Sequence, residues 1–378
     1  MIKFKIKYAI IIALGISPIA SLQAQNLDQQ TALLVEELRL EESDMAMRDL
    51  PRWKKPDKVY INISRFTPDS EEQKMMLDAA REVAGDVEII PVKNNLDEEI
   101  VNNMEVLISR CDIDDMLNAK NLLWFQHSAH GVDDCLTPDT IRKDFVLTNA
   151  QHTSGPPIAE HVIGMIMMMS RGLLQLHSAQ IEHNWIRRAS GIPIIEIKGK
   201  TLLVAGLGGI GTAVAYRAHA LGMRVLATRN SSRSGPDFVE YVGLSDELYE
   251  LSKQADVVVN TLPMTPDTAG LFNKQFFDTV KKGAYYISVG RGETTVTSDL
   301  IDALKDGRLT AAGLDVTVPE PLPSDHELWT LPNIIITPHI AALTDQGRWR
   351  RWLVVRENLR RYINGDKLLN VVNKELGY

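Results

Sequence analysis

The sequence predicts an α/β protein built from two doubly wound units with parallel sheets. From Lys58 onward, short apolar strands alternate with helical stretches, which favours parallel strand pairing through crossover helices. The alternation forms two series, and the second begins near Lys198. The length of 378 residues suits two domains of ordinary size. We therefore expect two lobes, each with its own sheet and core.

The composition excludes several classes of protein. Hydrophobic residues make up 44% of the chain and charged residues 24%, as in soluble globular proteins. With 41 basic and 49 acidic residues, the net charge of −8 provides no global cationic field, so nucleic acid is not an expected partner. The two cysteines exclude a disulfide scaffold and a zinc site with four thiolates.

Residues 1–24 are predicted to be a secretory signal peptide. Lys3, Lys5 and Lys7 form a basic start, residues 8–20 are almost entirely apolar, and the segment 21–24 offers a cleavage site after Ala24. The alternative is a membrane anchor, but 13 apolar residues fall short of the roughly 20 that span a bilayer. We expect a periplasmic or secreted protein that has no membrane partner after cleavage, with a cytoplasmic location as the alternative.

Residues 25–57 are predicted to be a helical extension and linker. Apolar residues from Leu33 to Leu40 are spaced as on one helix face, and Pro51 and Pro56 follow them. Nothing in this segment indicates chemistry.

The strands of the two units are short apolar runs. In the first unit they cover 59–63, 87–90, 106–108 and 122–126, with helices at 70–84 and 97–103. In the second unit they cover 201–206, 224–228, 257–260, 284–289, 311–314 and 334–337. Between the units, residues 157–174 form an apolar helix rich in Met and Ile, which we expect to be a connector buried between the domains.

A glycine motif follows the first strand of the second unit. Gly206, Gly208 and Gly211 form G-x-G-x-x-G, with Gly209 and Ile210 between them, at the start of a helix. Small residues here permit a tight turn, a close approach of pyrophosphate and anion binding by the N–H groups at the helix start. The strand, helix and next strand around the motif favour a dinucleotide site over an ordinary tight turn.

The end of the next strand favours NADP over NAD. An acid usually binds the ribose hydroxyls of NAD at this place, whereas the chain has Arg229, Asn230, Ser231 and Arg233. Guanidinium, amide and hydroxyl groups can neutralise and hydrogen-bond a 2′-phosphate. NAD stays possible, and the alternative is a solvated turn.

At this point the sequence resembles the D-isomer-specific 2-hydroxyacid dehydrogenases over about residues 58–378. The matches, in order, are Ser128 to Asp133, Ala159-Glu160-His161, the glycine motif, Thr261 to Gly270, Val289 to Gly292, Gly313 to Val316, Glu320 to Pro323 and Thr337-Pro338-His339. The resemblance implies that a Rossmann cofactor lobe, 154–342, is inserted into a flavodoxin-like substrate lobe, 58–153 plus 343–378.

The resemblance assigns three catalytic residues. Arg291 would clamp the substrate carboxylate and polarise the ketone, because its planar fork binds a carboxylate at two points. His339 would deliver the proton to the ketone oxygen, because imidazole can act as an acid near neutral pH. Glu320 would pair with His339 and favour the imidazolium. Taken separately, each could be a structural residue, and the family order favours the catalytic interpretation.

Further site residues also follow from the resemblance. It extends the cofactor site to Leu262, Pro263, Thr268 and Val289, and lets Asp315 hold the nicotinamide carboxamide. The loop Ala129-His130-Gly131 would present N–H groups to the substrate carboxylate. His130 replaces an expected small residue, so it either narrows the pocket or adds a cation.

The remaining histidines and cysteines suggest no metal. His127, His152, His161 and His183 lack the compact spacing of a zinc site, and hydride transfer needs none. Cys111 and Cys135 permit at most one bridge, and we favour two buried free thiols. The family implies a homodimer, with the 157–174 helix as a candidate interface.

The sequence thus predicts an NADPH-preferring oxidoreductase acting on small 2-oxo and 2-hydroxy acids, with glyoxylate and hydroxypyruvate as candidates. The alternative is a non-catalytic NAD(P) sensor or regulator with the same fold.

Overall fold

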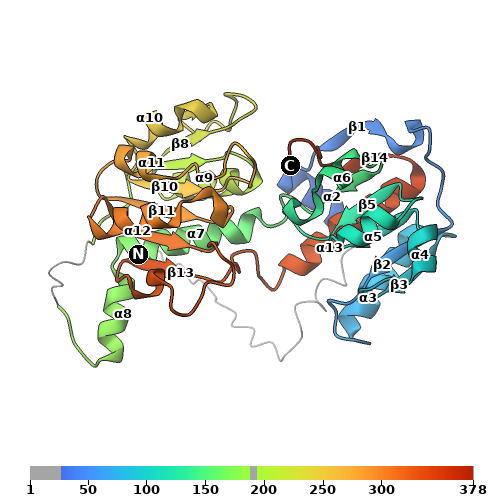
Figure 1. The fold of residues 1–378 in the computed structure, drawn as a ribbon, viewed down its shortest axis with the longest axis horizontal. Helices are drawn as coiled ribbons and strands as arrows, with labels where there is room; N and C mark the ends of the chain where they lie inside the picture. The colour runs from blue at the N-terminus through green and yellow to red at the C-terminus, as the bar shows by residue number, and fades with distance from the viewer. Residues whose placement is uncertain (1–26, 188–193, 378) are drawn as a thin grey trace, which may run out of the picture.

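The computed structural model describes residues 27–187 and 194–377, and the predicted signal peptide therefore lies outside the described residues. The described chain forms two lobes that lie side by side (Figure 1). We call the lobe that holds strands β2 to β6 the first lobe, and the lobe that holds β7 to β13 the second lobe. The predicted residue boundaries between them stay a prediction.

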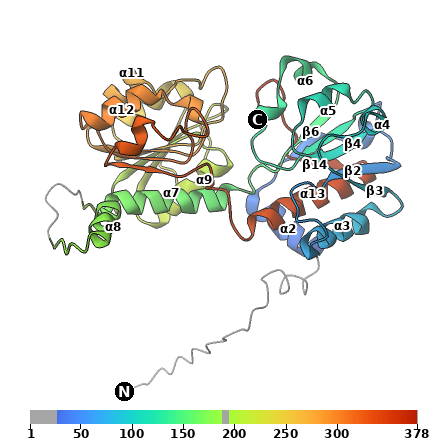
Figure 2. The same cartoon turned by 60° about the horizontal axis from the view of Figure 1, so that its bottom comes forward.

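The first lobe contains a five-stranded parallel sheet in the order β3-β2-β4-β5-β6. Its strands are β2 (Lys58–Asn62), β3 (Glu88–Val92), β4 (Val106–Ser109), β5 (Trp124–His127) and β6 (Val146–Thr148). Its helices are α3 (Glu71–Ala84), α4 (Glu98–Asn103), α5 (Ile113–Asn118), α6 (Pro138–Arg142) and, from the end of the chain, α13 (Gly347–Asn364). Helix α13 packs on α3, so the C-terminal segment returns to the first lobe (Figure 2).

The second lobe contains a seven-stranded parallel sheet in the order β13-β12-β11-β10-β7-β8-β9. Its strands are β7 (Thr201–Ala205), β8 (Arg224–Thr228), β9 (Tyr241–Gly243), β10 (Val257–Asn260), β11 (Ala284–Ser288), β12 (Leu309–Leu314) and β13 (Ile334–Ile336). Helices α7 (Gly155–Ser170) and α9 (Gly209–Ala220) cover one face. Helices α10 (Leu248–Ser252), α11 (Lys274–Thr279) and α12 (Thr297–Lys305) cover the other.

The predicted fold class is confirmed, because both sheets are parallel and connected by helices. Each strand that we expected from an apolar run is present, within a few residues of its predicted ends. The short strands β6 and β9 were missed. Each has three residues, which is too short a run to show a periodic pattern of apolar residues.

The predicted connector helix belongs to the second lobe instead of lying between the lobes. Helix α7 packs along α9 and against β11 and β12 (Figure 2). Its side chains Val162, Met165 and Ile166 belong to the core of that lobe. The single helix predicted over 157–174 is two helices in the structure. Gly172 adopts a left-handed conformation, and α8 (Leu173–Ile181) starts after it. The apolar character therefore reflects burial against a sheet. Its part in a homodimer stays a prediction.

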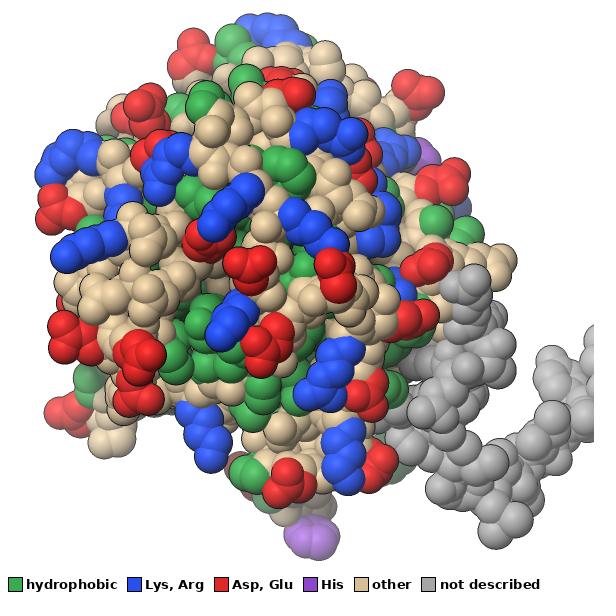
Figure 3. Space-filling view, turned by 90° about the vertical axis from the view of Figure 1, so that its right-hand side faces the viewer, with side chains coloured by type: hydrophobic (Ala, Val, Ile, Leu, Met, Phe, Trp, Pro, Cys, Tyr) green, Lys and Arg blue, Asp and Glu red, His purple; other side chains and the backbone are tan. Residues whose placement is uncertain are grey.

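No helix within the described residues is long and apolar enough to cross a membrane. On the face of the first lobe shown in Figure 3, basic and acidic side chains are interspersed with hydrophobic ones. Such mixing is typical of solvated protein surfaces.

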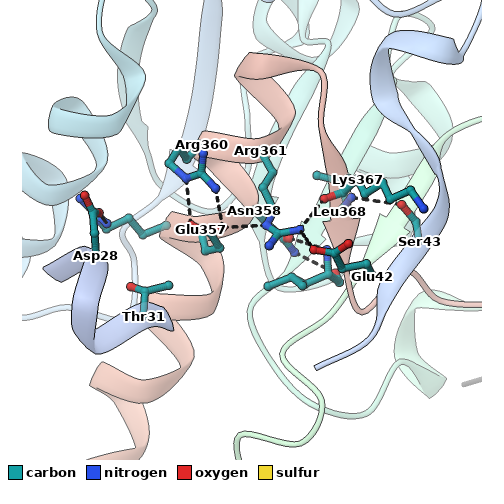
Figure 4. Close-up of polar contacts among 12 residues, drawn as sticks. Asp28, Thr31, Glu42, Ser43, Glu357, Asn358, Arg360, Arg361, Lys367 and Leu368 are labelled. Carbon is teal, nitrogen blue, oxygen red and sulfur yellow. Dashed lines mark hydrogen bonds and ion pairs between the residues drawn. The ribbon is translucent and has the colours of Figure 1, made fainter. Parts of the chain in front are cut away.

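The N-terminal extension is more structured than we expected. Helix α2 (Leu27–Leu38) packs on α13, and the polar segment β1 (Glu42–Ala46) pairs antiparallel with β14 (Lys367–Leu369). Ion pairs reinforce this contact, since Arg361 binds both Glu42 and Glu357 with N–O distances of 2.7 Å (Figure 4). Buried Arg356 pairs with Asp28 at 2.7 Å. The prediction of a linker was therefore wrong for 42–46, where backbone pairing outweighs the polar composition.

Cys111 and Cys135 form a disulfide, so the expectation of two free thiols was wrong. Their Cα atoms lie 5.2 Å apart, within the range that a disulfide spans. The bridge joins the segment after β4 to the 3-10 turn η2 (Asp133–Cys135). Their sequence separation of 24 left a bridge possible but does not give the distance between their Cα atoms.

Candidate functional site

The candidate site contains residues at the carboxyl ends of strands from both lobes, which is where parallel α/β sheets bind ligands. Arg291 follows β11 of the second lobe, and Asp133 belongs to the turn after β5 of the first. Arg291 Nε donates to Asp133 Oδ2 at 2.7 Å, and Nη2 lies 2.6 Å from the same oxygen. Nη1 donates to the carbonyl of Gly290 at 2.9 Å. These contacts fix the guanidinium at the boundary between the lobes.

The predicted substrate loop reaches this guanidinium. A Cβ atom at Gly131 would overlap Arg291 Nη2, so only glycine fits at this position in the observed arrangement. The loop is held from behind, since the Ala129 carbonyl accepts from Ala150 N at 2.9 Å and the His130 carbonyl accepts from Asn149 Nδ2 at 2.7 Å. Gly131 and His130 are thus close to Arg291, while the predicted contact of the loop N–H groups with a substrate carboxylate stays a prediction.

His130 is neutral at physiological pH. Burial, together with the neighbouring His152 and Arg291, lowers the pKa of its imidazole to about 3. Of our two expectations for this residue, the added cation is therefore wrong. The alternative, that its ring narrows the pocket, stays a prediction.

His339 and Glu320 form the hydrogen bond that the resemblance implied. His339 Nδ1 lies 2.8 Å from Glu320 Oε2, and Glu320 Oε1 accepts from Thr317 N at 3.0 Å. The His339 side chain is half exposed. Its Nε2 atom has no hydrogen-bond partner among the residues that the structure describes, so this nitrogen is available to a ligand.

Buried Asp315 positions the turn that carries His339. Its Oδ1 accepts from Thr337 Oγ1 at 2.6 Å and from Ile340 N at 3.0 Å, and its Oδ2 accepts from Ala341 N at 3.0 Å. The Asp315 carbonyl also accepts from His339 N at 2.8 Å. His339 adopts a φ of 54°, which these bonds enforce. The predicted carboxamide contact of Asp315 stays a prediction, and this positioning role was missed.

Two residues in the site were not predicted from the sequence. His161 Nε2 lies 3.0 Å from Thr337 Oγ1 and so supports the His339 turn. Asp133 is the last residue of the matched motif Ser128 to Asp133, but the sequence assigned no role to it. Its contact with Arg291 joins residues 158 apart in sequence, so only the structure could show it.

The glycine motif forms a cradle that fits a dinucleotide. Helix α9 begins at Gly209, and Ile210 lies in its first turn. Gly206 has a φ of 96° and lies against Leu262, while a Cβ at Gly211 would overlap the Gly206 carbonyl. Strand and helix therefore approach more closely than larger residues would permit. The first N–H groups of α9 lack helical acceptors and can bind a pyrophosphate.

The two arginines after β8 differ in their surroundings. Arg233 pairs with Glu247, and its Nη1 also lies 2.8 Å from the Tyr241 hydroxyl. Arg229 makes one long contact, from Nη1 to the Ser234 carbonyl at 3.4 Å. Asn230 Oδ1 accepts from Ser245 Oγ at 3.2 Å, and Ser231 is exposed. The guanidinium of Arg229 is therefore the more available of the two.

The other predicted cofactor residues line the strand ends beside the cradle. Leu262 and Pro263 follow β10, and the Thr268 hydroxyl donates to the Pro263 carbonyl at 2.7 Å, which closes this loop. Val289 is buried directly after β11. All of these residues lie at the same sheet edge as Arg291.

A group of arginines lies at the corresponding edge of the first lobe. Arg65 follows β2, Arg110 directly follows β4, and Arg351 is near the start of α13. Burial lowers the pKa of Arg65 and Arg351, and each is lowered further by the neighbouring guanidinium groups. Within residues 27–187 and 194–377, none of these three side chains has an ion-pair or hydrogen-bond partner. This edge therefore attracts anions.

The family model that matches this chain covers most of the second lobe. Residues 163–341 match the family described as D-isomer specific 2-hydroxyacid dehydrogenase, NAD binding domain. The chain is 32% identical over 301 residues to the D-3-phosphoglycerate dehydrogenase of Methanocaldococcus jannaschii, covering 77% of this chain and 56% of the relative. It is 30% identical over 279 residues to the glyoxylate reductase of Aeropyrum pernix, covering 72% of this chain and 82% of the relative.

A solved structure is similar over both lobes. It is the NADPH-dependent glyoxylate/hydroxypyruvate reductase of Sinorhizobium meliloti in complex with NADP and sulfate, with a TM-score of 0.70 and 27% identity. The match covers 86% of this chain and all of that structure.

Proposed function

Because the chain belongs to the D-isomer-specific 2-hydroxyacid dehydrogenase family, we propose that it is an NADPH-preferring reductase of small 2-oxo acids, with glyoxylate and hydroxypyruvate as first candidates. Enzymes of this family are NAD(P)-dependent oxidoreductases acting on hydroxy acids. The observation that carries the proposal is the placement of Arg291 beside the Ala129–Gly131 loop, together with the His339–Glu320 pair at the same edge of the second lobe.

Arg291 binds the substrate. Its guanidinium lies between the two lobes and already holds one carboxylate, that of Asp133. A substrate carboxylate can share or replace this contact, and the ketone oxygen next to it is then polarised by the same cation. Neutral His130 adds no second positive charge beside the loop, so Arg291 is the cation that we assign to the substrate carboxylate.

His339 holds the proton. With Nδ1 engaged by Glu320, the proton that reaches the ketone oxygen resides on Nε2. The Glu320 carboxylate orients the ring through its contact with Nδ1, and Asp315 holds the turn that carries His339. The dinucleotide, held at the glycine cradle, supplies the hydride when it is bound. In the direction of oxidation, His339 accepts the proton.

We expect purified protein to oxidise NADPH with glyoxylate or hydroxypyruvate, as followed by absorbance. Replacing His339 by Gln removes the proton donor and should lower kcat by about 10²–10⁴-fold, while NADPH binding persists. Arg291→Ala should raise KM and lower kcat, because it removes both binding and polarisation.

His219→Gln, on an exposed part of α9, is the matched control and should retain wild-type turnover. If the wild-type protein binds NADPH but reduces none of glyoxylate, hydroxypyruvate, pyruvate and a branched 2-oxo acid, the enzyme proposal fails. A cofactor-sensing protein would then be the better interpretation.

The preference for NADPH is proposed to rest on Arg229. Its guanidinium follows the end of β8 and is little engaged by other residues, which suits contact with a 2′-phosphate. The likeness to an NADPH-dependent reductase solved with NADP supports this assignment. Arg233 is held by Glu247 and contributes less.

Changing Arg229 to Asp should raise the Kd for NADPH by about 10-fold or more, because an acid repels the 2′-phosphate, and should leave the Kd for NADH nearly unchanged. Cofactor fluorescence measures both constants. Arg233→Ala is the comparison and should alter the NADPH constant less. Equal weakening of NADPH and NADH by Arg229→Asp would refute the assignment.

A second candidate substrate is a 2-oxo acid with a distal phosphate. The observation that favours it is the group Arg65, Arg110 and Arg351, which forms no ion pair within the described residues at the edge of the first lobe. The likeness to a D-3-phosphoglycerate dehydrogenase supports the same class, although the chain spans about half the length of that relative. A phosphate at this edge would be stabilised by several guanidinium groups at once.

If this candidate is correct, Arg351→Met should raise KM for 3-phosphohydroxypyruvate by about 10-fold and leave KM for glyoxylate unchanged. Arg348→Met is the matched control, because Arg348 already pairs with Glu72 at 2.8 Å. Steady-state kinetics with both acids distinguish the two cases. Failure to reduce the phosphorylated acid would exclude this candidate and leave the first proposal intact.

Export is also proposed. The basic and apolar start of the sequence supports a signal peptide over residues 1–24, and the Cys111–Cys135 disulfide suits an oxidising compartment. N-terminal sequencing of the protein from its native host should start at Gln25. An intact Met1 would contradict export and favour a cytoplasmic protein.

A further inference from the structure

The disulfide lies beside two further side chains that can bind a metal ion. One potential ligand atom from each of Cys111, His127, Asp134 and Cys135 lies within 4.8 Å of the others, and the two sulfur atoms become ligands only when the disulfide is reduced. Cys111 Sγ lies 3.2 Å from His127 Nδ1, and Cys135 Sγ lies 3.8 Å from Asp134 Oδ1. None of these four residues belongs to the reaction site described above.

The fold explains why these residues meet. Strands β4 and β5 pair with Ser109 opposite His127, so Cys111, two residues after Ser109, lies beside the end of β5. The turn η2 then brings Asp134 and Cys135 back over the same strand ends. His127 and Cys135 are buried, whereas Asp134 is exposed, so the group is open to solvent on one side only.

We propose that this group has a second state, which forms after the disulfide is reduced. In that state one Zn²⁺ ion is bound in a tetrahedral site by the two thiolates, His127 Nδ1 and the Asp134 carboxylate. Two sulfur ligands with one nitrogen and one oxygen are a donor set that zinc accepts. Sulfur atoms at opposite corners of such a site lie about 3.8 Å apart, given Zn–S bonds of about 2.3 Å. Cα atoms 5.2 Å apart allow this by side-chain rotation alone.

The change between the two states requires two electrons and two protons, which a thiol reductant supplies. A dithiol breaks the Cys111–Cys135 bond, becomes a disulfide itself, and leaves two cysteine thiols. Metal binding then releases the two thiol protons. The oxidised protein offers only His127 and Asp134, which are too few ligands for tight binding of zinc.

The charges around the site favour the bound state. Two thiolates, one carboxylate and Zn²⁺ carry a net charge of −1. Arg65 lies close enough to interact electrostatically with Asp134, and Arg110 directly precedes Cys111. These cations stabilise thiolates and offset the negative charge of the site. The site would thus form without an uncompensated charge.

The test uses the mature protein under anaerobic conditions, reduced with dithiothreitol and then desalted. Titration with Co²⁺, a spectroscopic substitute for zinc, should give one bound ion per chain with the absorption of a tetrahedral thiolate complex. One equivalent of Zn²⁺ should displace it and protect both thiols from alkylation. The unreduced protein should give no such absorption. Reduced protein that binds no Co²⁺, or binds it without thiolate absorption, overturns the proposal.

Variants identify the ligands. Cys111→Ser should abolish the thiolate absorption, but it also removes the disulfide. His127→Asn and Asp134→Asn keep the disulfide, and after reduction each should weaken Co²⁺ binding by at least 10-fold. Asp114→Asn, a nearby acid outside the group, is the matched control and should bind like wild type. Undiminished binding in His127→Asn and Asp134→Asn would refute the assignment. All readouts are independent of turnover, so they stand apart from the proposed reductase.

Discussion

The buried carboxylate of Asp315 is the constraint on which the rest of the site depends. A carboxylate removed from water must be satisfied by hydrogen bonds, and Asp315 obtains three of them from residues 337–341. These bonds fix the turn in which His339 adopts a positive φ. Since β12 lies between β11 and β13 in the sheet, the same strand ends place Arg291 and His339 on either side of Asp315. A core interaction thereby determines the relative positions of the cation and the proton donor.

The contact between Arg291 and Asp133 links this edge to the first lobe. Both side chains are partly exposed, so the ion pair contributes little to stability. Its importance is geometric, because it holds the guanidinium beside the Gly131 backbone. Asp133 also belongs to the turn η2, which the disulfide joins to the segment after β4. Cys135 is therefore only two residues from Asp133, whose contact orients Arg291.

Sequence reasoning succeeded where the signal is local and failed where it is not. The glycine motif and the strands around it are local patterns, which one sequence reveals. The importance of Arg291 and Asp315 and the pairing of Glu320 with His339, 19 residues apart, came from the family resemblance. The polar strand β1 has no apolar alternation, and only its pairing with β14 makes it a strand. The neutrality of His130 depends on burial and on two neighbours that come from distant segments. The disulfide required a Cα distance that spacing does not contain.

The charge distribution is consistent with an acidic substrate in a protein that is itself acidic. The net charge of −8 would repel an anionic substrate at long range. Near the strand ends of the first lobe, however, Arg65, Arg110 and Arg351 form no ion pair within residues 27–187 and 194–377, and across the boundary Arg291 pairs with Asp133. Within about a Debye length, roughly 8 Å at physiological salt, these local cations outweigh the distant negative charges. A small acid that approaches the boundary between the lobes is therefore attracted there, while the rest of the surface repels it.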